Sequence, residues 1–238
     1  HGIDPKVFFK IDSGDTRFKH FETEHGLDQY DFKILYLNRN IRRKQPNDVM
    51  LAFKHFADQL PLDKRDKCCL IYHTQVLDDN GTDLKAVHEH LMPDYNVVFT
   101  QDVQPVFNSQ QMNFIYNISD VYINLASNEG FGLGSCEALT CGTPIVVNVT
   151  GGLQDQCGFK KEVVYDGCAV AKDYLTHEDY VELKSNHRGT YKEHGEWVVP
   201  VFPSNISCQG SPMTPYIFDD RVQYEDAGEA LLSWYQRG

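Results

Sequence analysis

Residues 121–149 read VYINLASNEGFGLGSCEALTCGTPIVVNV, the most strongly patterned stretch of the chain. The apolar run Val121–Ala126 predicts a buried strand, Gly134–Thr140 a short helix and Pro144–Val149 the next strand. Three glycines between residues 130 and 134 let the backbone approach a ligand closely. The free N–H groups at the start of such a helix favour an anion, above all a phosphate. The stretch therefore predicts an anion site at the carboxyl end of a strand.

The segments before this stretch alternate between apolar runs and amphipathic runs. Connections of a few residues join them, an order that predicts right-handed crossovers and a parallel sheet. We therefore expect an α/β fold, a Rossmann-like parallel sheet with helices on both faces. The expected strands are Asp31–Leu37, Cys68–His73 and Asn96–Thr100, and the expected helices are Asn47–Gln59, Thr82–Met92 and Ser109–Ile118.

The alternation stops after about Gly151. Residues beyond it are rich in Gly, Pro, Asp and aromatic side chains without sustained periodicity, which predicts an irregular insertion. Within it, Glu196–Phe202 predicts one more strand and Ser204–Pro215 a loop. The expected single domain, residues 1–238, consists of a core over 1–152, an insertion over 153–220 and a returning helix over 223–236.

The composition argues against several classes of protein. Lys and Arg number 22 and Asp and Glu 34, and the net charge of −12 speaks against a nucleic-acid-binding surface. No apolar run approaches the roughly 20 residues of a transmembrane helix, and no signal-peptide pattern is present. The seven scattered cysteines lack CxxC spacing, which favours reduced thiols and a cytoplasmic location. Because the chain opens at His1 without an initiator Met, we expect a piece of a longer protein.

Two carboxylates flank the glycine-rich loop. Its glycine spacing matches neither the dinucleotide fingerprint nor a P-loop. Glu129 and Glu137 would repel a phosphate, but sugar and ribose hydroxyls are natural partners for such groups. A solvated loop acid at Glu129 and a helix-start acid at Glu137 are the structural alternatives.

A basic cluster follows the first expected strand. Arg39, Arg42, Arg43 and Lys44 fall within eight residues of a chain that is otherwise acidic. Arg39 offers a planar fork to phosphate oxygens and Lys44 a mobile point charge. The alternative, a solvated basic patch, remains open and is the stronger interpretation for Arg42 and Arg43.

Together these blocks resemble the C-terminal domain of retaining glycosyltransferases of family 4, which have the GT-B fold. The matching residues are Glu129-Gly130-Phe131-Gly132, Glu137-Ala138, Cys141-Gly142-Thr143-Pro144, Gly151-Gly152 and the segment Leu37–Lys44. The resemblance covers residues 1–152 well and 223–236 loosely. The insertion and the aromatic-rich tail suggest a divergent, virus-encoded member.

The resemblance implies one half of a GT-B enzyme that binds a nucleoside diphosphate sugar, GDP-mannose or a UDP-hexose, for transfer with retention to a glycan or protein acceptor. It implies that Arg39 and Lys44 hold the diphosphate, that Glu129 binds the transferred sugar and that Glu137 binds the ribose. It further implies that the backbone after Phe99 and Thr100, at the end of a strand, meets the nucleobase. The resemblance also assigns backbone amides of Phe131, Gly132, Leu133, Gly134 and Ser135 to the diphosphate.

The same resemblance implies no metal and no cofactor. We also expect that the N-terminal acceptor domain is absent from this chain, which would then bind the donor without transferring it. Two other classes stay open. The first is a different GT-B enzyme. A sugar-nucleotide epimerase would epimerise the donor without an acceptor, and a phosphorylase would carry a lysine-bound pyridoxal phosphate. A non-catalytic module would bind the nucleotide sugar without turnover in the full-length protein.

Overall fold

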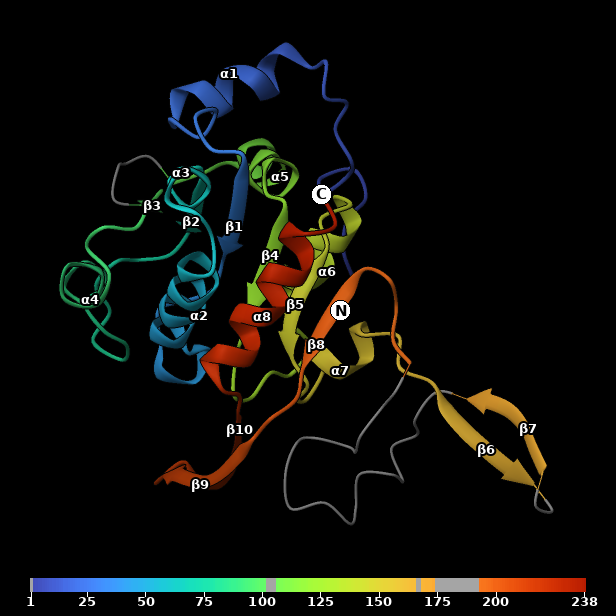
Figure 1. Cartoon of the computed structure of the whole chain (residues 1–238). Helices are drawn as coiled ribbons and strands as arrows, with labels where there is room; N and C mark the ends of the chain where they lie inside the picture. The colour runs from blue at the N-terminus through green and yellow to red at the C-terminus, as the bar shows by residue number, and fades with distance from the viewer. Residues whose placement is uncertain (1, 102–105, 166–167, 174–192) are drawn as a thin grey trace.

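A six-stranded parallel sheet lies at the centre of the chain (Figure 1). The computed structural model describes residues 2–101, 106–165, 168–173 and 193–238. The strand order is β3-β2-β1-β4-β5-β8, and each strand runs parallel to its neighbours. The expected α/β fold with a Rossmann-like parallel sheet is confirmed. The strands are β1 (Phe32–Tyr36), β2 (Cys68–Tyr72), β3 (Val97–Phe99), β4 (Val121–Asn124), β5 (Ile145–Asn148) and β8 (Val198–Val201).

The order of the strands reverses between β1 and β4. From β1 the chain moves outward to β2 and β3, and it then returns to the other side of β1 to form β4. There Ile34 lies opposite Val121, and Leu35 opposite Tyr122. Open parallel sheets bind ligands outside the carboxyl ends of their strands at such a reversal. The loops after β1 and β4 are therefore the place where this fold positions a site.

Helices cover both faces of the sheet, which explains why the central strands are mostly apolar. Every residue of β1, β2, β4 and β5 is buried. One face carries α2 (Pro46–Asp58), α4 (Leu84–Leu91) and α8 (Tyr224–Tyr235), and the other carries α1 (Thr16–Glu24), α5 (Ser109–Ile118), α6 (Leu133–Thr140) and α7 (Leu153–Gln156). A short helix, α3 (Leu62–Arg65), precedes β2. None of the described helices is long and apolar enough to cross a bilayer.

The terminal helix α8 packs against α2, as its apolar face predicts. Phe32 of β1 lies between Phe56 of α2, at 5.6 Å between ring centroids, and Tyr235 of α8, at 5.3 Å. The α2 side chains at helical spacing, Val49, Phe53 and Phe56 among them, are buried in the same core. Each such burial contributes roughly 1.5–3 kcal/mol. The last helix of the chain is therefore part of the core that begins with β1.

The segment after α7 contains more regular structure than its sequence predicts. The loop expected over Ser204–Pro215 is wrong, since β9 (Asn205–Ser211) and β10 (Thr214–Arg221) form an antiparallel hairpin there. A second antiparallel pair consists of β6 (Lys161–Tyr165) and β7 (Cys168–Asp173). The strand expected over Glu196–Phe202 is confirmed as β8. Residues 166–167 and 174–192 of the expected insertion lie outside the described residues.

Candidate functional site

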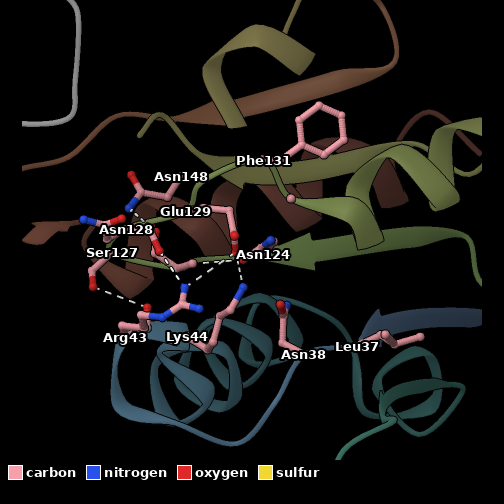
Figure 2. Close-up of polar contacts among 12 residues, drawn as sticks. Leu37, Asn38, Arg43, Lys44, Asn124, Ser127, Asn128, Glu129, Phe131 and Asn148 are labelled. Carbon is pink, nitrogen blue, oxygen red and sulfur yellow. Dashed lines mark hydrogen bonds and ion pairs between the residues drawn. The ribbon is translucent and has the colours of Figure 1, made fainter. Parts of the chain in front are cut away.

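The loops after β1 and β4 meet at the carboxyl edge of the sheet (Figure 2). The backbone N–H of Ser127 donates to the carbonyl of Arg43 at 2.8 Å. In return, the Arg43 guanidinium donates from Nη1 to the carbonyl of Asn128 at 2.9 Å. From β5, Asn148 Nδ2 donates to the carbonyl of Ala126 at 2.9 Å. Three strand ends are thus tied together at the point where the strand order reverses.

Lys44 and Glu129 form a buried ion pair at this junction. Lys44 Nζ donates to Glu129 Oε2, and the two side chains are only 10% and 12% exposed. Figure 2 shows Lys44 and Arg43 pointing toward the same carboxylate, and Arg43 Nη1 lies 3.8 Å from Glu129 Oε2. Burial lowers the pKa of Lys44, and the neighbouring carboxylate opposes that shift. Two cations thus surround one carboxylate, and the cluster retains a net positive charge.

Arg39 is held by a residue that the sequence did not single out. Its Nε lies 3.0 Å from Asp78 Oδ2, in the loop after β2. The hydrogen bond from Arg39 lowers the pKa of Asp78, so this partner stays ionised. Since the Arg39 side chain is 63% exposed, most of its fork faces solvent at the edge of the site. The structure therefore places Arg39 in a separate ion pair from that of Lys44 and Glu129.

The glycine-rich loop turns into α6 through a left-handed residue. Gly132 has φ of +85° and is the N-cap of α6, with no side-chain cap. The Leu133 side chain is exposed, and the Phe131 ring points away from Lys44 in Figure 2. These residues can therefore serve a ligand through their backbone amides rather than through their side chains.

The glycine pair after β5 supports the loop from behind. A Cβ at Gly151 would strike the Glu129 carbonyl, and one at Gly152 would strike Gly130. Gly152 also donates its N–H to the Glu129 carbonyl at 2.8 Å. The close approach of the two backbone segments is the physical reason for glycine at both positions. It also holds the backbone at Glu129 in place.

Glu137 lies on the second turn of α6 and has one buried partner. Its Oε2 accepts a hydrogen bond of 2.6 Å from the Tyr116 hydroxyl. Burial raises the pKa of Tyr116 well above its usual value, so the phenol stays a donor. The other carboxylate oxygen lies on a half-buried side chain and is available to a ligand hydroxyl.

The side chains of Phe99 and Thr100 are engaged with the protein. The Thr100 hydroxyl lies 2.7 Å from His73 Nδ1, and the Phe99 ring lies 5.7 Å from that of Tyr72. Burial lowers the pKa of His73 to about 4, so its ring is neutral near pH 7. Any contact of this strand end with a ligand therefore runs through backbone, and the backbone of residues 102–105 lies outside the described residues.

Tyrosines that look like ordinary core residues in the sequence support the site. The Tyr122 hydroxyl donates to the Leu37 carbonyl at 3.1 Å and accepts from Asn38 Nδ2 at 3.2 Å. A Cβ at Gly134 would lie 2.5 Å from the same hydroxyl. Tyr122 therefore links the loop after β1 to the first turn of α6. No spacing rule distinguishes this role from packing, because it depends on the paired strands.

The described residues contain no group of three or more His, Cys, Asp or Glu side chains placed to hold a metal ion.

Comparisons with known proteins agree with this architecture. The family model of glycosyl transferases, group 1, matches residues 18–182. No curated protein matches the chain. Among solved structures, WaaG, a glycosyltransferase involved in lipopolysaccharide biosynthesis, superposes with a TM-score of 0.58 at 14% identity over 99% of this chain. Anabaena HepE in complex with UDP and glucose has a TM-score of 0.51 at 19% identity over 65% of this chain.

The match is to part of each larger protein. The chain covers 46% of WaaG and 38% of HepE, less than half the length of either. The parallel sheet and the helices on its two faces are those of GT-B glycosyltransferases. Since the family model spans more than half of the chain, and the glycine-rich loop and the basic segment lie within it, this chain belongs to the group 1 glycosyl transferases.

Proposed function

We propose that this chain is the donor-binding domain of a glycosyltransferase and holds a nucleoside diphosphate sugar at the junction of the loops after β1 and β4. The observation that carries the proposal is the cluster of Lys44, Arg43 and Glu129 beside the uncapped start of α6. A diphosphate needs cations and free N–H donors, and a sugar needs a fixed carboxylate. This junction brings all three together.

Lys44 and Arg39 serve the diphosphate in this proposal. Lys44 has three donors, so it can hold Glu129 and a phosphate oxygen together. Arg39 adds its exposed fork from the edge of the site. The amides of Gly132, Leu133 and Gly134 supply further donors, whereas the Ser135 N–H already donates to the Gly132 carbonyl at 3.1 Å. Charge develops on the diphosphate as it leaves, and preorganised donors of this kind lower the barrier by several kcal/mol.

Glu129 and Glu137 serve the two sugars of the donor. Glu129 is fixed by Lys44 and by the glycine pair behind it, which suits a carboxylate that orients hydroxyls of the transferred sugar. Glu137 lies on the second turn of α6, where Tyr116 holds one of its oxygens and the other faces the ribose hydroxyls. The nucleobase lies beyond Phe99 and Thr100, at the end of β3.

The reaction proposed is metal-independent transfer with retention to a glycan or protein acceptor. If the acceptor attacks the face from which the diphosphate leaves, the leaving phosphate takes the proton and no protein nucleophile is required. Lys44, Arg39 and the helix start then provide the positive charge. Both GDP-mannose and UDP-hexoses remain candidate donors. The UDP and glucose bound to HepE make UDP-glucose the first donor to test.

The experiment is calorimetric titration of UDP, GDP, UDP-glucose and GDP-mannose into the chain and into Lys44→Ala. We expect one of the two nucleotides to bind. Lys44→Ala should lower the affinity for that nucleoside diphosphate at least tenfold, because a charge-assisted hydrogen bond contributes about 1.5–3 kcal/mol. Lys54→Ala is the matched control, since that lysine pairs with Asp58 on α2 outside the site. Equal binding by Lys44→Ala and Lys54→Ala would contradict the proposal.

A further inference from the structure

The last residue of α7 holds the backbone of the glycine-rich loop. The Gln156 side chain donates from Nε2 to the carbonyl of Phe131, and also to the carbonyl of Gly132 at 3.2 Å. The short helix lies directly behind this turn, because a Cβ at Gly132 would lie 2.6 Å from Leu153 Cδ2 and 3.1 Å from Gln156 Nε2. One side-chain amide therefore contacts two successive peptide groups of the loop.

These two contacts determine where the neighbouring N–H groups point. In a planar trans peptide, the carbonyl and the N–H of the same unit point in opposite directions. The Phe131 carbonyl shares its peptide with the Gly132 N–H, and the Gly132 carbonyl shares its peptide with the Leu133 N–H. Because Gln156 holds both carbonyls on the α7 side, the N–H groups of Gly132 and Leu133 face away from α7.

The two N–H groups are available to a ligand. Gly132 is the N-cap of α6, and the first N–H groups of a helix have no partner within the helix. Within the described part of the chain, neither the Gly132 N–H nor the Leu133 N–H has a hydrogen-bond partner. Donors of this kind attract an anion. In the proposed function they contact the diphosphate from the side opposite to Gln156.

Packing alone does not explain a glutamine at position 156. Its neighbours Leu153 and Cys157 are fully buried in the core. Gln156 Oε1 is also buried, and it has no hydrogen-bond partner among the described residues. A buried polar atom without a partner is unfavourable, and an apolar side chain of the same length would avoid it. What such a side chain lacks is the pair of N–H donors that the loop carbonyls accept.

The sheet holds Gln156 in turn. Trp197 Nε1 donates to the backbone carbonyl of Gln156 at 2.9 Å. The Trp197 carbonyl accepts from the Ile145 N–H at 2.9 Å, next to the pairing of β5 with β8. The end of α7 is therefore tied to the sheet, and its side-chain amide has a fixed position relative to the loop.

We propose that Gln156 is a positioning residue of the donor site, which aims the N–H groups of Gly132 and Leu133 at the oxygens of the nucleoside diphosphate. This inference rests on the proposed function. Gln156 acts through the loop and does not touch the donor itself. Because the two N–H groups are oriented before the donor arrives, binding does not have to rearrange the loop, and the same donors meet the charge that develops as the diphosphate leaves.

The test is nuclear magnetic resonance of the isotope-labelled chain during titration with UDP and GDP, combined with calorimetry. We expect the amide proton signals of Gly132 and Leu133 to move downfield as the nucleoside diphosphate binds. Gln156→Met keeps the length of the side chain and removes its donors. It should lower the affinity roughly tenfold and abolish that movement at saturation. Gln59→Met is the matched control, since Gln59 also donates to a backbone carbonyl, that of His55 at 3.3 Å, but at the end of α2.

A second variant leaves Gln156 in place. Trp197→Phe removes the N–H that holds the Gln156 backbone, and it should weaken binding by a smaller factor. Equal affinity of Gln156→Met and the wild-type chain would overturn the inference. Unmoved Gly132 and Leu133 signals in a wild-type chain saturated with nucleotide would overturn it as well, even if Gln156→Met does not fold. If neither nucleotide binds the wild-type chain, the proposed function fails and this inference fails with it.

Discussion

Lys44 and Glu129 are charged side chains that the fold takes largely out of water. Removing one of two such partners leaves the other unpaired, which costs roughly 3–5 kcal/mol in a fully buried pair and less here. We expect Lys44→Met and Glu129→Gln each to lower the free energy of unfolding, and the double variant to lose less than the sum. Urea unfolding of the four proteins measures this coupling. Additive losses would show that the pair does not stabilise the loops.

Glu137 tests the ribose contact. Glu137→Ala should weaken nucleotide binding by roughly 1–3 kcal/mol through lost charge-assisted hydrogen bonds. Tyr116→Phe should weaken it less, because it removes only the hydroxyl that orients the carboxylate at 2.6 Å. Glu89→Ala, an exposed acid on α4, is the control. If calorimetry gives Glu137→Ala and Glu89→Ala the same nucleotide affinity, Glu137 does not belong to the site.

His73 makes the stability of the fold depend on pH. Burial lowers its pKa from 6.5 to about 4, so below pH 6.5 the unfolded chain binds a proton that the folded chain does not. The contribution of neutral His73 to the free energy of unfolding is fully present above pH 6.5. It is lost as the pH falls toward 4, and the total loss is roughly 3 kcal/mol. Urea unfolding at pH 7 and pH 5 should show a smaller difference for His73→Gln than for the wild-type chain. An equal difference would contradict this account.

Sequence patterns named the charged residues of the site but not their partners. The family resemblance assigns Lys44 to the diphosphate and Glu129 to the transferred sugar. The structure adds that these two side chains contact one another. Asp78, which holds Arg39, follows a different strand and becomes visible only when β1 and β2 are paired. The side chains of Phe99 and Thr100 are committed to packing, which no local pattern reveals.

At the scale of elements, the start of α6 depends on a contact between Gly134 and Tyr122. A methyl group at Gly134 would lie 2.5 Å from the Tyr122 hydroxyl and 3.2 Å from the ring carbon that bears it. We expect Gly134→Ala to lower the free energy of unfolding by roughly 1–3 kcal/mol. Adding Tyr122→Phe should recover part of that loss, since it removes the nearer atom. If the double variant loses as much free energy of unfolding as the two single variants together, the clash between Gly134→Ala and the Tyr122 hydroxyl is contradicted.

The alternating apolar and amphipathic runs predicted the central strands and their covering helices. That worked because burial on both faces imposes continuous apolar runs on β1, β2, β4 and β5. The β9–β10 hairpin has no such signal, because most of its side chains face solvent and leave no apolar alternation in the sequence. It is also the element that brings Arg221 to the start of α2, where Arg221 Nη2 donates to Gln45 Oε1 at 2.8 Å.

For the whole molecule, the proposed donor site is one side of a two-sided reaction. The chain spans 46% of WaaG, and the Lys44–Glu129 ion pair lies at the carboxyl edge of its sheet. We therefore expect the chain alone to bind a nucleoside diphosphate sugar and to transfer nothing to added saccharides. A radiolabelled-donor assay with and without acceptor measures this. Transfer by the purified chain would show that it carries a complete active site.

A crystal structure of the chain with the nucleoside diphosphate that binds best would test the donor site directly. We expect both phosphorus atoms between Lys44 and the first turn of α6, with Glu137 contacting the ribose and Glu129 facing the place of the transferred sugar. A diphosphate bound elsewhere on the chain would contradict the proposed donor site.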